Sequence, residues 1–322
     1  MKHASVLLTR RQWLLGVTGA ALAYSQPRNR MYNPLLAVHT SIWQTEAAIR
    51  KVQLADIEDE AFTSIHRAGY RRLELTSDFL APDLRTRTLD LLRKRSLQPA
   101  LVSAAGPLWE KAAAEDSRER VLDIARLMNG WDTRFIDFHP ALKPDGAAKT
   151  ADEIEMQAYQ LSRMGQDLAQ TGMRLIVGHG VAEMQNDARE WRYTVGHTEI
   201  SQVSFCVDVE CAVRAGMPPL TLLDTAGSRL RSLQLRNLNN GVSQEVLRDG
   251  DINMVPVARF LHQSSYDGFL VVDLRRDAAT PRQYPITEAL SLSRWYMQEI
   301  FGSRQGSPPV DFGPHVRERK HG

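Results

Sequence analysis

The sequence predicts a (β/α)8 TIM barrel, a closed ring of parallel strands with helices outside it, over residues 34–302. Eight short apolar segments are typical of strands, four of them with the alternating two-residue period, and helix-like segments separate nearly all of them. The eight units occupy about 270 residues, the length typical of a closed barrel. No glycine-rich phosphate turn follows the first strand, which argues against an open dinucleotide-binding sheet.

The expected strands are rich in branched apolar residues and end on polar groups. They cover residues 34–39, 71–76, 99–103, 134–139, 173–179, 204–210, 232–237 and 268–274. Amphipathic spacing predicts helices at residues 56–69, 84–95, 118–128, 152–170 and 286–300. Alternation of strands and helices implies parallel pairing with right-handed crossovers. The helix expected between residues 180 and 203 is poorly defined by its sequence.

The composition is that of an ordinary globular protein. Of the 322 residues, 43% are apolar and 24% are charged, and the formal net charge is +2. This balance gives no electrostatic case for binding nucleic acid or an anionic membrane. Two cysteines are too few for a disulfide scaffold, and Cys206 and Cys211 are expected to be buried thiols rather than a bridge or a metal pair.

The N-terminal segment, residues 1–25, predicts a Tat-type signal peptide. A twin pair, Arg10 and Arg11, precedes a short apolar run and the small-residue sequence Ala21-Leu-Ala23. The pattern predicts an extracytoplasmic, periplasmic protein with no membrane association once the segment is cleaved. A chance arginine pair before a short helix is the alternative. The polar tail, residues 303–322, is expected to be disordered.

Three polar residues end the last three expected strands, namely Asp208, Gln234 and Asp273. The carboxyl ends of barrel strands converge on one mouth, so these side chains are expected to meet there. Asp208 and Asp273 are the carboxylates available for catalysis. Helix capping, or a salt bridge to Arg236 or Arg275, is the structural alternative for each aspartate.

Further polar side chains are expected at the same mouth, as a substrate-binding group: Glu74, Glu183, Arg236, His39 and His139. Arg236 suits a carboxylate or phosphate on a substrate, and pairing with Asp208 or Asp273 is the alternative. Glu74 either lines the site or pairs with Arg72.

Five segments resemble the xylose-isomerase-like sugar isomerase/epimerase superfamily. They are residues 69–75 (GYRRLEL), 207–216 (VDVECAVRAG), 233–237 (LQLRN), 249–253 (DGDIN) and 266–273 (YDGFLVVD). Members of that family fold as (β/α)8 barrels. Many bind one divalent metal through two glutamates, an aspartate and a histidine at strand ends, and they interconvert ketoses, aldoses or their epimers.

The resemblance implies roles for individual residues. Asp208 matches the metal-binding aspartate, whereas Gln234 stands where the family usually has histidine and Asp273 where it has glutamate. The fifth strand ends in Gly178-His179 instead of supplying a glutamate. His179 can act as the third ligand, because imidazole suits Mn²⁺, Co²⁺ or Zn²⁺. The metal set implied for Mn, Co, Zn or Mg is therefore His179, Asp208, Gln234 and Asp273.

The function expected from these observations is an exported sugar isomerase or epimerase. It would act on a sugar or a sugar-derived keto acid by metal-assisted proton transfer, which needs a base beside the carbon and a cation or donor beside the developing oxyanion. The alternative is a non-catalytic, carbohydrate-binding barrel that has lost the metal. A DNA-directed nuclease is disfavoured, since its surface should be basic.

Overall fold

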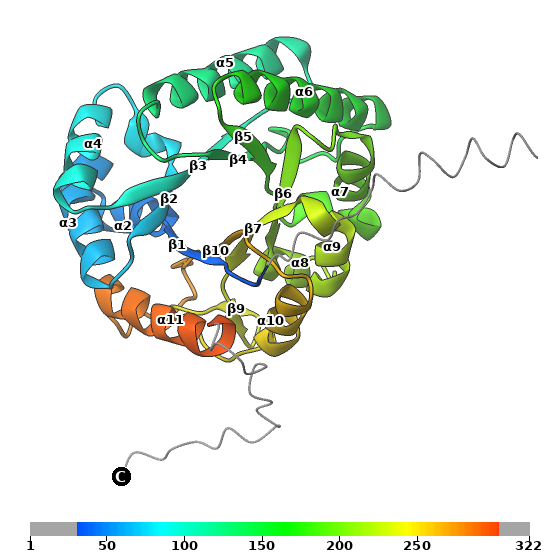
Figure 1. The fold of residues 1–322 in the computed structure, drawn as a ribbon. Helices are drawn as coiled ribbons and strands as arrows, with labels where there is room; N and C mark the ends of the chain where they lie inside the picture. The colour runs from blue at the N-terminus through cyan, green and yellow to red at the C-terminus, as the bar shows by residue number, and fades with distance from the viewer. Residues whose placement is uncertain (1–30, 303–322) are drawn as a thin grey trace, which may run out of the picture. The chain divides into compact units, whose positions relative to one another are not determined.

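The computed structural model describes residues 31–302, so the expected signal peptide and C-terminal tail lie outside the described range. Eight parallel strands form one closed barrel in the order β1-β10-β7-β6-β5-β4-β3-β2 (Figure 1). Their bounds are β1 (Leu35–His39), β2 (Arg72–Thr76), β3 (Gln98–Gly106), β4 (Phe135–Pro140), β5 (Arg174–Val177), β6 (Val203–Asp208), β7 (Leu230–Leu235) and β10 (Phe269–Val272). The predicted fold class is confirmed.

Helices surround the ring of strands on its outer side (Figure 1). They are α2 (Ser41–Arg50), α3 (Leu54–Arg67), α4 (Arg85–Lys94), α5 (Lys111–Leu127), α6 (Ala151–Gln170), α7 (Gln185–His197), α8 (Val209–Arg214), α9 (Pro219–Ala226), α10 (Met254–Gln263) and α11 (Ile286–Phe301). In residues 31–302, every helix is too short or too polar to cross a bilayer.

Local sequence explains where the longest helix starts and stops. Thr150 accepts a hydrogen bond from the Glu153 main-chain N–H at 3.3 Å, and the Glu153 carboxylate accepts one from the Thr150 N–H at 2.7 Å. This reciprocal pair caps the free amides of the first turn of α6. Gly172, with φ of 81°, takes the left-handed conformation that ends the helix.

Two apolar layers hold the barrel together. The larger one lies between the outer faces of the strands and the helices. The smaller one fills the barrel interior with side chains that alternate with the outward-facing set, namely Ala37, Ala100, Leu101, Ile176, Cys206, Phe269 and Val271. Both cysteines are buried and free, as predicted. The inner layer forms an apolar floor, and the next inward position is polar on most strands, as at His39, Asp137, Asp208 and Asp273, but is Gly178 after β5.

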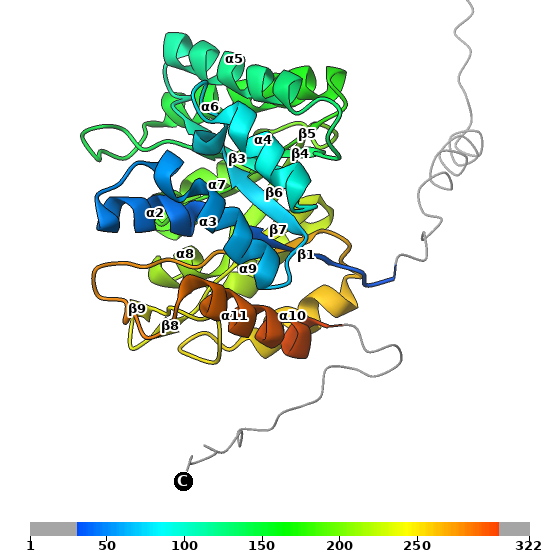
Figure 2. The ribbon, with the colours of Figure 1, turned by 90° about the vertical axis from the view of Figure 1, so that its left-hand side faces the viewer.

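Some elements differ from the prediction. The first strand is followed at once by α2, and a hairpin of β8 (Leu238–Asn239) and β9 (Val242–Ser243) follows β7 on the same side of the barrel (Figure 2). After β5, a short 3-10 turn, Ala182–Met184, leads into α7. Residues 186–188 adopt left-handed φ angles of 52°, 58° and 54°, so the backbone is not regularly helical at the start of α7.

Candidate functional site

The strand period places a polar layer directly above the apolar floor. His39 pairs in register with Glu74, and Asp208 pairs with Gln234, so these residues lie at similar heights around the ring. Asp137, on β4, lies two residues after Phe135 of the inner layer and therefore on the same face of the strand. Because side chains two residues apart in a strand share one face, all of these groups enter the barrel interior at its C-terminal end.

The tightest group in this layer consists of Glu74, Asp137 and His139. Each offers one ligand atom, and these atoms all lie within 4.8 Å of one another. Glu74 and Asp137 are fully buried, whereas the His139 side chain is 27% exposed and its Nε2 lies 3.5 Å from Asp137 Oδ1. Among residues 31–302, no other group of three His, Cys, Asp or Glu side chains comes as close together.

Both carboxyl groups of this cluster are short of partners. Neither oxygen of Asp137 accepts a hydrogen bond from a described residue, and Oε2 of Glu74 also lacks one. Burial, followed by the neighbouring Asp137 carboxylate, raises the pKa of Glu74 well above its usual range. Burial also raises the pKa of Asp137, against the opposing effect of His139. Two buried carboxyls in contact cannot both be ionised unless a cation lies with them, and without a cation one of the two keeps its proton.

His39 connects this cluster to the opposite side of the mouth. Its Nδ1 accepts the Ser41 main-chain N–H at 3.1 Å, which places the proton of the neutral ring on Nε2. Nε2 lies 3.7 Å from Glu74 Oε1, and Nδ1 lies 3.4 Å from Asp273 Oδ1. Burial lowers the pKa of His39 to about 4, although Asp273 opposes the shift. The ring is therefore neutral at pH 7.

A second polar group at the mouth consists of Asp208, Asp273 and Arg236, with Arg236 between the two aspartates. Arg236 follows β7 and its guanidinium bonds to Asp208 through Nη2 and to Asp273 through Nη1. All three side chains are at most 2% exposed. Burial works against the charge of Arg236, but Asp208 and Asp273 raise its pKa above the usual value. Burial likewise opposes ionisation of Asp273, but Arg236 lowers its pKa overall.

The remaining oxygens of the two aspartates are also occupied. Asp208 Oδ1 accepts the Cys211 N–H at 2.9 Å and so caps α8, while Asp273 Oδ1 accepts the Ser41 hydroxyl at 2.7 Å. The two aspartates predicted to meet at the mouth are thus brought together, through Arg236. Both structural alternatives, capping and the salt bridge to Arg236, are observed at Asp208.

His179 was predicted to be a metal ligand, but its ring nitrogen bonds to the protein backbone. Its Nε2 accepts the main-chain N–H of Asp208 at 3.1 Å, and its ring meets Trp191 edge-on with centroids 5.1 Å apart. Burial lowers the pKa of His179 to about 4, against the effect of Asp208. In this arrangement the Nε2 lone pair is used by the protein backbone. Within residues 31–302, His179, Asp208 and Asp273 do not offer three ligand atoms within 4.8 Å of one another.

Other predicted residues have definite partners. Glu74 faces Gln234, whose Nε2 lies 3.4 Å from Oε1, so Gln234 is turned towards the Glu74 cluster. Glu183 accepts the Gly180 N–H at 2.9 Å and holds the loop after β5. Their proposed roles as substrate or metal contacts stay predictions.

Asp137 is the site residue that sequence reasoning missed. The signal for it was present, because Asp137 lies two residues before the predicted mouth residue His139 in an otherwise apolar strand. A charged residue in phase with a mouth residue must enter the barrel. Its partners could not be read from the sequence.

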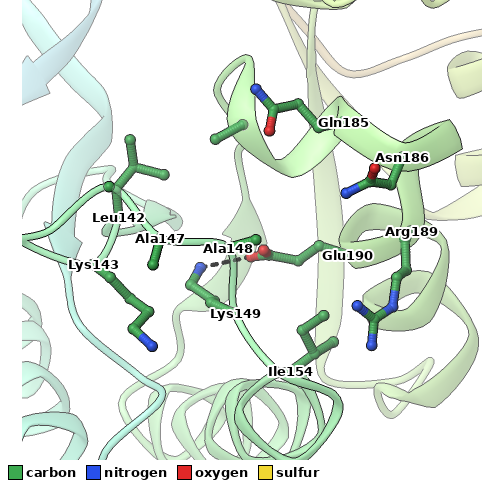
Figure 3. Close-up of a pocket in the computed structure, with 12 residues that line it drawn as sticks. Leu142, Lys143, Ala147, Ala148, Lys149, Ile154, Gln185, Asn186, Arg189 and Glu190 are labelled. Carbon is green, nitrogen blue, oxygen red and sulfur yellow. Dashed lines mark hydrogen bonds and ion pairs between the residues drawn. The ribbon is translucent and has the colours of Figure 1, made fainter.

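A pocket opens near this end of the barrel, between the loop after β4 and the start of α7 (Figure 3). It measures about 550 Å³, including space open to solvent, and Lys149 and Glu190 meet across it. Lys149 Nζ lies 2.6 Å from Glu190 Oε1 and 2.8 Å from Gln157 Oε1. The buried Lys149 is therefore neutralised, and it joins the loop after β4 to α6 and α7.

Comparison with known proteins finds curated relatives named inosose dehydratase. The chain is 24% identical over 157 residues to inosose dehydratase of Lacticaseibacillus casei, covering 42% of this chain and 53% of that protein. For inosose dehydratase of Geobacillus thermodenitrificans the identity is 25% over 171 residues, covering 48% and 56%. The chain thus spans about half the length of the curated relatives it matches. No family model matches it.

Solved structures share the fold over most of the chain. D-allulose 3-epimerase from Methylomonas sp. superposes with a TM-score of 0.67 and 13% identity, covering 83% of this chain and 98% of that one. D-psicose 3-epimerase of Clostridium cellulolyticum gives a TM-score of 0.64 at 12% identity, covering 83% and 99%. A 3-keto-D-glucoside 4-epimerase from E. coli gives 0.60 at 14% identity, covering 82% and 100%. These likenesses show that the chain shares the barrel fold of these structures.

Proposed function

We propose that this protein is an enzyme that moves a proton on a carbon atom beside a carbonyl group, in a keto sugar or keto-cyclitol. One observation carries the proposal: two buried carboxyl groups, Glu74 and Asp137, meet two imidazoles, His39 and His139, in the polar layer of the barrel. Epimerisation beside a keto group and loss of water beside one both begin with removal of such a proton. The relatives named inosose dehydratase and the epimerase neighbours support this substrate class.

The chemistry assigned to the cluster follows from its electrostatics. The raised pKa of Glu74 favours its protonated form, which can donate to a substrate oxygen as negative charge develops there. His39, neutral and with its proton on Nε2, presents that N–H towards Glu74 Oε1 at 3.7 Å and so helps to position the carboxyl group. His139, the most exposed member, is the group that a ligand at the mouth would meet first. The predicted substrate contacts Glu74, His39 and His139 are retained in this proposal.

The same cluster fits a divalent metal ion. Two carboxylates and an imidazole, with Asp137 and Glu74 oxygens that lack hydrogen-bond partners among the described residues, form a donor set suited to Mn²⁺, Co²⁺ or Zn²⁺. When bound, the ion would displace the proton held by the carboxyl pair and would polarise a substrate carbonyl in place of protonated Glu74. Glu74, Asp137 and His139 are accordingly the residues we assign to metal binding.

Hydrogen exchange tests the proposed reaction independently of the final product. Protein incubated with keto sugars and keto-cyclitols in D2O should catalyse exchange of the hydrogen beside the carbonyl, followed by NMR. Glu74→Gln and Asp137→Asn should abolish exchange. Glu58→Gln is the matched control, since Glu58 is also a fully buried glutamate, on α3, with a pKa raised by burial. Equal loss in the control would show a general effect of removing a buried acid.

A non-catalytic carbohydrate-binding barrel is the second candidate. Arg236 favours it, because the guanidinium is ion-paired with both aspartates expected to act in catalysis. Calorimetric binding of the same sugars without any exchange in D2O would support this reading, and exchange lost in Glu74→Gln would reject it.

We also propose export by the Tat route, on the strength of Arg10, Arg11 and the Ala21-Leu-Ala23 sequence. Cell fractionation should find the wild-type protein outside the cytoplasm and an Arg10→Lys, Arg11→Lys variant inside it. Arg28→Lys with Arg30→Lys, beyond the expected cleavage site, is the control. Unchanged export of the twin-lysine variant would reject the proposal.

A further inference from the structure

The two mouth aspartates hold a cation that belongs to the chain itself. Asp208 ends β6 and Asp273 follows β10, and β7 lies between these strands and pairs with both. Arg236, just past the end of β7, extends its guanidinium between the two carboxylates and bonds to each. Arg236 therefore comes from β7, the strand that is next to the strands of both aspartates.

The charges around Arg236 exceed what it can neutralise. Glu210 Oε2 lies 3.5 Å from Arg236 Nε, so three buried carboxylates face one buried guanidinium. The nearest additional cation of Asp273 is Arg275, whose Nε is 3.8 Å away and whose side chain is 47% exposed. Glu210 in turn is paired with Arg214 at 2.7 Å. Between Asp208 and Asp273, Arg236 is the buried positive charge.

The carboxylates are positioned by contacts that do not involve Arg236. The Cys211 main-chain N–H holds Asp208 Oδ1, and the Ser41 hydroxyl holds Asp273 Oδ1, which leaves Oδ2 of each facing the guanidinium. Cys211 Sγ lies 3.3 Å from Arg236 Nη2. If the guanidinium were removed, two preoriented carboxylate oxygens and a thiol would surround the space it leaves.

We propose that Arg236 is the resident cation of the Asp208–Asp273 pair and keeps a diffusible divalent metal ion out of it. Removing the guanidinium should convert the pair into a site for Mn²⁺, Co²⁺ or Zn²⁺, with carboxylate ligands suited to these ions. A covalently tethered cation gives the two aspartates a shared counter-charge without any external metal. This inference concerns binding alone and does not depend on the proposed enzymatic reaction.

The test counts metal ions bound to purified, chelator-treated protein. All variants carry Asp137→Asn, so that the Glu74 cluster does not contribute. Equilibrium dialysis against Mn²⁺ should show one additional ion bound on adding Arg236→Ala, and affinity about tenfold weaker or worse on further adding Asp208→Asn. Free guanidinium at about 10 mM should raise the melting temperature of the Arg236→Ala protein and not that of the Asp208→Asn combination.

Two results would overturn the proposal. The first is an Arg236→Ala protein that binds no more Mn²⁺ than its parent, which would make Arg236 a structural ion pair only. The second is a parent that, with Arg236 present, binds an ion lost in Asp208→Asn. If Arg236→Ala does not fold, Arg236→Lys is used instead, because its ammonium group cannot fork to both carboxylates. Mn²⁺ should then raise the melting temperature of Arg236→Lys and not of Arg236→Lys with Asp208→Asn.

Discussion

The ring of His139 occupies the space that any side chain at residue 178 would need. A Cβ atom added to Gly178 would lie 2.2 Å from His139 Cε1 and 2.6 Å from both ring nitrogens. The absence of a side chain at the end of β5 is therefore what lets the β4 imidazole turn towards Asp137. Gly178 is in this sense part of the site, although it offers no functional group.

Gly178→Ala should move the His139 ring and leave the fold intact, because the ring is 27% exposed and can turn outward. Metal affinity of the Glu74 cluster should fall about tenfold or more, as expected when a ligand is misplaced. Isothermal titration with Mn²⁺ measures this. Gly196→Ala is the control, since a Cβ there meets nothing within 4 Å. Unchanged Mn²⁺ affinity in Gly178→Ala would show that His139 is not a ligand of the metal ion.

Glu74→Gln should stabilise the metal-free protein as pH rises. The pKa of Glu74 is raised in the folded state. Its neutral form therefore contributes to the folding stability of the protein at low pH, and this contribution is lost as pH increases through the folded-state pKa. The amide cannot ionise, and at pH 8 the gain should be about 1–3 kcal/mol, the usual cost of a buried polar group without a partner. Urea unfolding in the presence of chelator measures it. A variant less stable than wild type at pH 8 would contradict the assignment.

His179 should make the protein sensitive to acid. Its pKa is lowered from 6.5 to about 4, so the folded protein binds fewer protons than the unfolded chain between these values, and stability falls as pH decreases from 6.5 towards 4. At pH 5 the loss should be about 2 kcal/mol. Chemical unfolding at pH 7 and pH 5 should show a smaller loss for His179→Gln. The exposed His197→Gln is the control for removing an imidazole. An unchanged pH dependence in His179→Gln would show that this ring does not titrate as proposed.

Arg236→Met should destabilise the protein by about 3–5 kcal/mol in metal-free buffer, because it leaves buried carboxylates without their counter-charge. Adding Asp208→Asn and Asp273→Asn should recover much of this loss, since no buried charge then lacks a partner. Urea denaturation of the single and triple variants gives the comparison. A loss below about 1 kcal/mol in Arg236→Met would mean that the ion network behaves like a surface one.

Much of the barrel could be predicted because each strand is recognisable from its own local sequence. Residues 71–76 and 204–210 alternate apolar and polar residues, and residues 34–38 are a continuous apolar run, so these patterns need no knowledge of distant residues. The residues 186–188 could not be predicted in the same way. Their φ angles are left-handed, and no glycine in the sequence marks them.

The sequence by itself determined which side chains enter the barrel, since the two-residue period of a strand assigns every residue to the inner or the outer face. That is why Asp208, Gln234 and Asp273 could be placed at one mouth. Only the tertiary structure decided which of the inward groups meet. Arg236 lies 28 residues from Asp208 and 37 from Asp273, yet it bonds to both. Strand pairing sets these contacts, because β7 lies between β6 and β10 and brings the carboxyl ends of the three strands next to one another.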